Sequence, residues 1–306
     1  MKSKLRKSLK EKKFVFTAET SPPDSGNKQV IVDQVDCLRG LADAINVTDG
    51  AGAKSHMSAL ATATIIAQNG MEPILQFTTR DRNRIAIQGD LLGGWALGIP
   101  NILCLYGDEV KGGDQPETKE VRDLDTISLL KTAYDIKINK TYPSGRKITD
   151  APNFFIGGAD TPFKIKEDFD GANLLKKINV GVEFFQTQYA FDENVLKNYM
   201  LKLKQLGITD KAYFIIGLGV IKSAKSARWM NKNLFYDQYT RTRSYFQNTQ
   251  YEAKHLPGKE ELKILEPLRG KIPDRVFTEE YQPPKTDGSG NIRNNIRQAL
   301  RLFKKA

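Results

Sequence analysis

Seven short apolar runs alternate with helical patterns over the first 220 residues, and this alternation constrains the fold more than any other feature of the chain. Each run has the length of a strand, and apolar residues at helical spacing follow it. The expected strands cover residues 14–19, 44–49, 72–79, 101–108, 153–159, 182–188 and 212–219. Strands that are joined through helices must be parallel, because each crossover helix returns the chain to the end of the sheet at which the previous strand began.

The number of strand–helix units favours a (β/α)8 TIM-type barrel over an open, doubly wound sheet. No G-x-G-x-x-G motif follows the first expected strand, which argues against a dinucleotide-binding fold of the doubly wound type. An eighth strand is not evident in the sequence before Ala306. The fold prediction is therefore an α/β barrel whose closing strand the sequence does not reveal.

The expected domain organisation is simple. Residues 1–13 form a basic N-terminal extension, which we expect to be solvated and helical. Residues 14–306 form a single barrel domain, with an irregular, aromatic-rich insertion at about 233–290. An amphipathic basic helix over residues 291–303 ends the chain, docked on the barrel or, alternatively, lying on a membrane surface.

Charge and cysteine content narrow the class of protein. The net charge is +11, but the lysines are scattered without interleaved aromatic residues, which favours attraction of small anions over nucleic-acid binding. Cys37 and Cys104 stand in no metal-binding spacing, and with only two histidines we expect no metal site. No apolar run is long enough to span a membrane, and the N-terminus lacks the apolar core of a secretory signal, so the expected compartment is reducing cytoplasm.

Polar residues gather where the expected strands end. In a barrel the carboxyl ends of all strands project towards one mouth, so these side chains should converge there. Two or more carboxylates at one mouth indicate acid–base chemistry, whereas each one alone could simply cap the following helix. Two prolines follow the first carboxylate and leave few N–H groups for it to cap. The candidates are Glu19, Asp49, Gln76, Asp108 and Gln188.

Several basic residues admit two interpretations. The run from Arg80 to Arg84 lies at a strand-to-helix junction, where arginines could bind phosphate or form ion pairs with Asp81. Lys176 and Lys177 precede the sixth strand and could likewise meet a phosphate or be solvated. His56 is interpreted as a polar loop residue rather than a ligand.

With these segments placed, the chain resembles the methylenetetrahydrofolate reductase family, especially its short bacterial branch. Six motifs occur in family order over roughly residues 14–232, and six in register are far more specific than any one alone. They are Phe16-Thr-Ala-Glu19-Thr-Ser-Pro-Pro23, Asn46-Val-Thr-Asp49, Arg80-Asp-Arg-Asn-Arg84, Leu103-Cys-Leu-Tyr-Gly-Asp108, Phe155-Ile-Gly-Gly-Ala159 and Gln186-Thr-Gln188-Tyr-Ala-Phe-Asp192.

The resemblance implies an oxidoreductase on a flavin-binding (β/α)8 barrel. The implied cofactor is FAD, with FMN possible, and the implied electron donor is NADH or NADPH. The implied reaction reduces 5,10-methylenetetrahydrofolate to 5-methyltetrahydrofolate, a step of one-carbon metabolism that serves methionine biosynthesis. The flavin carries the redox chemistry, and the protein positions it.

The resemblance also implies roles for particular residues. Glu19 matches the general acid that assists opening of the five-membered ring of the folate, a role that needs a partly desolvated carboxyl group. Asp108 matches an acidic residue close to flavin and pterin, and Gln188 matches a residue that contacts folate. Positions that match the flavin site are Thr48, Gly107, Asp108 and Lys177. Two further flavin-site positions depart from some relatives, namely Tyr106, where they have Arg, and Gln76, where they have His.

Two alternatives stay open. The departures at Tyr106 and Gln76 allow a flavin-free reductase that transfers hydride directly from NADH. The missing eighth strand and the charge of +11 allow an inactive or partner-dependent barrel subunit, in which the tail or a partner chain supplies the missing strand. The chain could then act as a homo-oligomer or with a partner subunit.

Overall fold

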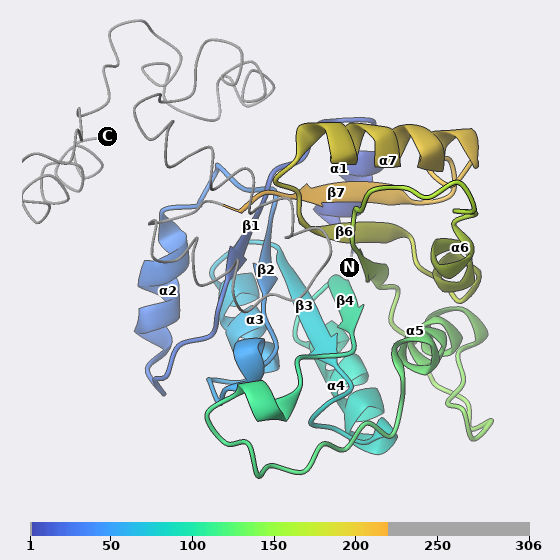
Figure 1. The fold of residues 1–306 in the computed structure, drawn as a ribbon. Helices are drawn as coiled ribbons and strands as arrows, with labels where there is room; N and C mark the ends of the chain where they lie inside the picture. Colours follow the sequence, from blue (N-terminus) through green and yellow to red (C-terminus); the bar gives the residue numbers. More distant parts are fainter. Residues whose placement is uncertain (1, 220–306) are drawn as a thin grey trace, which may run out of the picture. The chain divides into compact units, whose positions relative to one another are not determined.

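The protein folds as a curled sheet of parallel strands with helices on its outer face (Figure 1). The structure, a computed structural model, describes residues 2–219, which fall in one compact unit. Within this range seven strands lie side by side in sequence order, every neighbouring pair parallel. They are β1 (Thr17–Thr20), β2 (Ala44–Val47), β3 (Pro73–Thr78), β4 (Asn101–Leu105), β5 (Phe155–Asp160), β6 (Phe184–Tyr189) and β7 (Tyr213–Gly217). This half-barrel of alternating strands and helices confirms the predicted (β/α)8 class.

A helix follows each of the first six strands, with short helical turns in some of the loops. The helices are α2 (Lys28–Asp36), α3 (Ala59–Gln68), α4 (Arg84–Ala96), α5 (Thr126–Tyr134), α6 (Ala172–Asn179) and α7 (Glu193–Gln205), with the short turns η1 (Ala51–Ala53), η2 (Val110–Gly112) and η3 (Asp135–Asn139). Polar caps begin several of them: Ser58 accepts a hydrogen bond from Ala61 N–H and Asp125 accepts one from Ser128 N–H. The expected helix at 223–232, the insertion at 233–290, the helix at 291–303 and the position of an eighth strand lie outside the described residues.

Apolar residues separate into two cores according to the face of the strand that they occupy. Alternate residues such as Ile45, Leu75 and Ile102 pack against the helices outside the sheet. The intervening residues form a smaller core inside the curl, made of Ala44, Ile74, Leu103, Phe155, Phe184 and Ile215. The inner core fills the bottom of the half-barrel, which leaves the carboxyl ends of the strands for polar groups.

The basic N-terminal segment is more than a solvated extension. It contains helix α1 (Lys4–Lys10), and the side chain of Leu5 is fully buried in the inner core. The Glu72 carboxylate accepts hydrogen bonds from the N–H groups of Lys4 and Leu5, which fixes the start of the helix. The helical part of the expectation is correct, but α1 packs against the N-terminal end of the half-barrel, because the inner core needs an apolar cover there.

Candidate functional site

Polar side chains occupy the inner face of the half-barrel directly above the inner core. Residues two places apart on a strand share a face, so Asn46 follows Ala44, Gln76 follows Ile74 and Gln186 follows Phe184 on the inside. Glu19 joins them, since Gln76 Nε2 donates a hydrogen bond to Glu19 Oε2 at 3.4 Å. The structure therefore brings Glu19 and Gln76 together, as the sequence analysis expects for residues at one mouth.

Glu19 has the character of a carboxyl group that favours its protonated form. Its side chain is accessible to water through the open mouth, yet protein atoms crowd around it on the inside of the curl. This desolvation raises the pKa of Glu19 above its ordinary value, while the weaker hydrogen bond from Gln76 opposes the shift.

Tyr189 belongs to one of the six motifs but is not among the predicted site residues. The pairing of β6 with β7 is irregular between Gln186 and Tyr189, so that Tyr189 pairs with Gly217. This places Tyr189 on the inner face, where burial first and the charge of Glu19 second raise the pKa of its phenol. A strand with one extra residue at its end is not recognisable from periodicity, which is why this neighbour of Glu19 escaped notice.

The same irregularity affects Gln188, which we expected to contact substrate. Its side chain is exposed, and its Oε1 accepts a hydrogen bond from the N–H of Tyr189 at 3.1 Å. Gln188 lies at the mouth, but its amide is engaged by the adjacent backbone. Its role in binding folate stays a prediction.

The residues present are compatible with a flavin at this mouth. Thr48 follows β2 on the inner face, and its buried Oγ1 has no hydrogen-bond partner within the described part of the chain. Such an orphaned hydroxyl suits the polar edge of a bound heterocycle. Gly107 has φ of +88°, and a Cβ at this position would lie 3.0 Å from Thr78 Cβ, so that glycine suits both the backbone and the space.

Asp108 and Tyr106 lie at the rim rather than inside the curl. One oxygen of Asp108, Oδ2, accepts a hydrogen bond from Gly52 N–H at 2.8 Å, which ties the loop after β4 to the loop after β2. The Tyr106 ring is half exposed, and the Arg122 guanidinium stacks on it at 3.7 Å. The structure thus gives both residues partners in the rim loops, and their contacts with flavin or pterin stay predictions.

Lys177 of α6 lies against the carboxyl end of β5. Its Nζ donates a hydrogen bond to Ala159 O at 2.6 Å, and burial lowers its pKa although the nearby Asp160 opposes the shift. Asp160 is itself buried, which raises its pKa, and Tyr199 donates its hydroxyl to this carboxyl group at 2.9 Å. Lys177 is therefore not simply solvated, and contact with a flavin would require it to leave or share this partner.

The arginine-rich run after β3 forms ion pairs. Arg80 bonds both oxygens of Asp81, Arg82 pairs with Asp49 and Asp90, and Arg84 pairs with Asp123. Of the two interpretations left open for this run, the structure supports the ion-pair network. Asp49, a strand-end candidate, is engaged in the same network and also accepts the N–H of Thr78.

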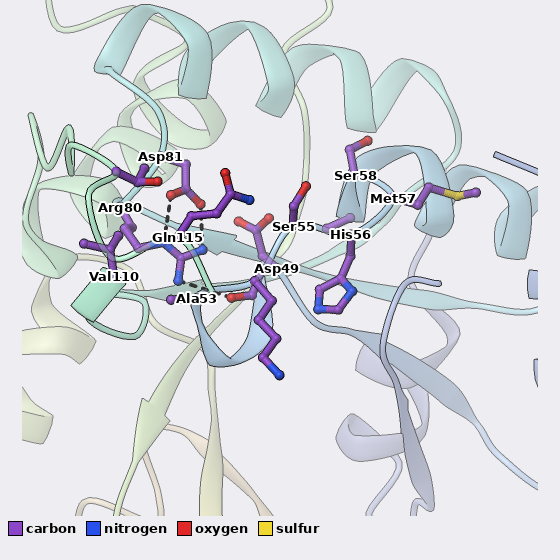
Figure 2. Close-up of a pocket in the computed structure, with 14 residues that line it drawn as sticks. Asp49, Ala53, Ser55, His56, Met57, Ser58, Arg80, Asp81, Val110 and Gln115 are labelled. Atoms are coloured by element: carbon purple, nitrogen blue, oxygen red, sulfur yellow. Dashed lines mark hydrogen bonds and ion pairs between the residues drawn. The ribbon is translucent and has the colours of Figure 1, made fainter. Parts of the chain in front are cut away.

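A pocket of about 300 Å³ opens among the loops after β2, β3 and β4 (Figure 2). Figure 2 shows Arg80 and Asp81 paired beside it, and the remaining N–H groups of Arg80 donate to the carbonyls of Gly50 and Asp108. His56 also lines the pocket, with Nδ1 2.6 Å from Asp24 Oδ1. The buried Arg80 guanidinium at this pocket is thus neutralised by Asp81 and by backbone carbonyls, whereas Lys54 also lines the pocket.

Residues 2–219 offer neither a metal-binding cluster nor a membrane-spanning helix. Among these residues no cluster of three histidine, cysteine or carboxylate side chains is arranged to hold a metal ion. In the same part of the chain, no helix is both long and apolar enough to cross a membrane. Cys104 is buried in β4, which raises the pKa of its thiol to about 12.

Comparison with known proteins gives two unequal kinds of match. The profile of the family described as methylenetetrahydrofolate reductase matches residues 4–234, well over half of the chain. The "Uncharacterized protein YejA" of Escherichia coli (strain K12) is 47% identical over 78 residues, which are 26% of this chain and 13% of that protein. The "Probable peptide-binding protein YejA" of Agrobacterium fabrum is 36% identical over 77 residues, 25% of this chain and 12% of that protein. The chain thus spans only a small part of these relatives.

Solved structures match this chain only at low similarity. The spore cortex-lytic enzyme SleL of Bacillus cereus is 13% identical, with a TM-score of 0.41 over 67% of this chain and 50% of that one. The tryptophan synthase α-subunit from Pyrococcus furiosus is 14% identical, with a TM-score of 0.42 over 71% of this chain and 83% of that one. Neither likeness bears on function.

A parallel α/β half-barrel with polar side chains on the inner face of its mouth has the architecture of barrel enzymes, whose active sites lie at that end. The six motifs lie within this unit, and the family profile covers it. The chain belongs to the methylenetetrahydrofolate reductase family.

Proposed function

We propose that this chain reduces 5,10-methylenetetrahydrofolate to 5-methyltetrahydrofolate, with a reduced nicotinamide as donor and a flavin, FAD or FMN, as the intermediate carrier. The observation that carries the proposal is Glu19, a carboxyl group on the inner face of the mouth whose pKa is raised by its surroundings. Membership of the family, shown by the match over residues 4–234, supports the choice of substrate.

Glu19 would hold the proton that the reaction needs. A carboxylic acid that stays protonated near neutral pH can donate to a ring nitrogen of the folate, and the C–N bond of the five-membered ring then opens. Gln76 holds the Glu19 carboxyl from one side, and Tyr189 lies close enough for the charge of Glu19 to act on its phenol. A flavin bound beside them would supply the hydride transfer to the methylene carbon.

Thr48, Gly107 and Lys177 are the residues that would hold the flavin. The orphaned hydroxyl of Thr48 can bond the heterocycle, and Gly107 lets the backbone approach it closely. Lys177 could exchange its bond with Ala159 O for a phosphate of the cofactor. Asp108 and Gln188 would complete the contacts with the pterin if their loops rearrange on binding.

The first test is the visible spectrum of the purified full-length protein, before and after addition of FAD or FMN. A flavin spectrum that stays with the protein supports the proposal, and a protein that retains neither flavin contradicts the flavin part. Turnover of methylenetetrahydrofolate by protein proved free of flavin would instead support direct hydride transfer from NADH. Loss of both activities in a flavin-loaded protein would favour an inactive or partner-dependent subunit.

The second test separates the two half-reactions with Glu19→Gln. We expect flavin reduction by the nicotinamide donor to persist and folate reduction to fall by at least about 100-fold, the scale of a lost general acid. Glu193→Gln, an exposed change in the first turn of α7, is the matched control and should leave both half-reactions intact. Survival of folate reduction in Glu19→Gln would show that Glu19 is not the acid.

A further inference from the structure

The register of the sheet arranges the inner side chains in layers. Glu19 pairs with Asn46, and Asn46 pairs with Ile74, yet Glu19 bonds to Gln76, two residues further along β3. On every second strand, the side chain that belongs to the same layer therefore lies two residues beyond the residue that strand pairing places opposite. The tilt of barrel strands requires this offset. Glu19 and Gln76 belong to one such layer, which is contributed by the odd-numbered strands.

The layer directly beneath is contributed by the even-numbered strands. Starting from Asn46 on β2, the same advance leads to Leu103 on β4 and then to Gln186 on β6. Two amides and one leucine thus lie under Glu19 and Gln76. The fully buried ring of Phe184 lies further down, where it packs over Gly157, so polar groups in this layer cannot reach bulk water from below.

Both amides of this layer carry an oxygen that lacks a partner. Asn46 Oδ1 and Gln186 Oε1 are buried, and neither accepts a hydrogen bond from any residue that the structure describes. An unsatisfied buried acceptor is costly, and native proteins normally satisfy it with protein or with ordered water. Asn46 is nearly inaccessible as a whole, so that solvent at the mouth does not provide its partner.

In the layer above, the group without a partner is a donor rather than an acceptor. Gln76 donates to one oxygen of Glu19, so when Glu19 is protonated its O–H requires an acceptor of its own. Asn46 is the pairing partner of Glu19 on the adjacent strand, where inter-strand spacing is about 4.8 Å. One water molecule can satisfy all three groups, since it has two O–H groups for the two amide oxygens and a lone pair for the Glu19 O–H.

We propose that Asn46 and Gln186 form a buried water site beneath Glu19, and that the bound water accepts the Glu19 O–H and holds the acid in its protonated form. Three hydrogen bonds are the usual number for a buried water. Asn46 and Gln186 are positioning residues, because they act on the acid only through the water. The effect on turnover rests on the proposed function, whereas the water site itself does not.

The direct test is a high-resolution crystal structure of the full chain. We expect one ordered water within hydrogen-bond distance of Asn46 Oδ1, Gln186 Oε1 and the Glu19 carboxyl group. A dry layer, or amides that bond directly to each other or to Glu19, would overturn the proposal. This outcome does not depend on flavin or folate and is therefore separable from failure of the proposed function.

The second test follows the protonation of Glu19 by infrared spectroscopy of the flavin-free protein, with its band assigned by loss in Glu19→Gln. In Gln186→Met the water loses one acceptor and can turn an O–H towards the carboxylate, so the pKa of Glu19 should fall. We expect a shift of about half to one pH unit, the scale of one net hydrogen bond. Tyr189 is the titratable group that faces Glu19 from β6, and it is unchanged in this variant.

Leu103→Met is the matched control, since it alters the same layer without removing a polar group and nearly conserves volume. It should leave the Glu19 titration in place. An equal shift in both variants, or none in Gln186→Met, would overturn the proposal. If Gln186→Met fails to fold, Asn46→Leu removes the other acceptor and predicts a shift in the same direction.

Discussion

At the scale of single residues, the ionisation of Glu19 should be visible in the stability of the protein. Because its folded-state pKa lies above its ordinary value, its contribution to stability is fully present at pH below that value and is lost as pH rises through the folded pKa. Glu19→Gln is neutral at every pH and escapes this loss. We therefore expect the variant to gain in unfolding free energy relative to wild type as pH rises, measured by urea unfolding across pH.

Glu193→Gln, a change in the first turn of the outer helix α7, is the control for the removal of a surface carboxyl group. Parallel pH profiles for wild type and Glu19→Gln would mean that the carboxyl is as well solvated in the folded protein as in the unfolded chain. That result would remove the main support for its role as an acid.

Gly157 is a second residue whose identity the structure explains. A Cβ at this position would lie 2.3 Å from Phe184 Cζ, and the Phe184 ring is held by stacking on Phe155 at 4.5 Å. Gly157→Ala should destabilise the protein by about 1–3 kcal/mol, the usual cost of overpacking. Gly26→Ala is the control, because its Cβ would meet nothing within 4 Å, and thermal unfolding of the two variants makes the comparison. Equal stability of the two would show that the inner core yields readily at Phe184.

At the scale of elements, helix α1 should behave as part of the barrel. Leu5 is fully buried among residues of six strands, so Leu5→Ala should cost about 2–5 kcal/mol of unfolding free energy. Lys7→Ala on the same helix is exposed and should change stability by no more than about 0.5 kcal/mol. Chemical unfolding of both variants tests this. A negligible effect of Leu5→Ala would show that the segment is a solvated extension that does not stabilise the barrel.

Helix α7 is joined to β5 through a buried hydroxyl–carboxyl pair. Tyr199→Phe removes the hydroxyl donor to Asp160, and the loss of this bond to a buried carboxyl group should cost about 1–3 kcal/mol at neutral pH. Burial raises the pKa of Asp160, and the lost bond raises it further, so stability should fall more steeply as pH rises. The cost of Tyr199→Phe, from unfolding curves at several pH values, should therefore be smallest in acid.

Tyr142→Phe offers the control for this pair, since it keeps the ring that packs under Arg146 and should change stability by no more than about 0.5 kcal/mol. A pH-independent cost for Tyr199→Phe would indicate lost packing rather than a lost bond to Asp160.

At the scale of the whole molecule, flavin binding should stabilise the folded chain by mass action. A flavin at 100 times its dissociation constant adds about 2.7 kcal/mol to the unfolding free energy, which corresponds to a rise of several degrees in Tm. Calorimetry of the full chain with FAD, FMN and ADP distinguishes recognition of the flavin ring from recognition of its nucleotide. The absence of a shift with both flavins would contradict the proposed cofactor.

The sequence by itself determined the strand–helix alternation, the parallel sheet and the family. Each of these depends on local periodicity and on motifs, which can be recognised in the sequence without knowledge of tertiary contacts. The sequence also placed Glu19 and Gln76 at one mouth, because both lie towards the carboxyl ends of strands, and in a barrel these ends meet at one mouth. The ion pairs of the Arg80–Arg84 run were one of two alternatives, since sequence proximity to Asp81 cannot reveal Asp49, Asp90 and Asp123 as partners.

Only the tertiary structure decided which polar groups surround Glu19. Tyr189 reaches the inner face through a register irregularity, and the register of the tilted strands places Asn46 and Gln186 in the layer beneath the acid. Leu5 is buried for a similar reason, since the need for a cover arises once the strands have curled. Local patterns fix which face a side chain occupies, but the layer that it shares depends on the register between neighbouring strands.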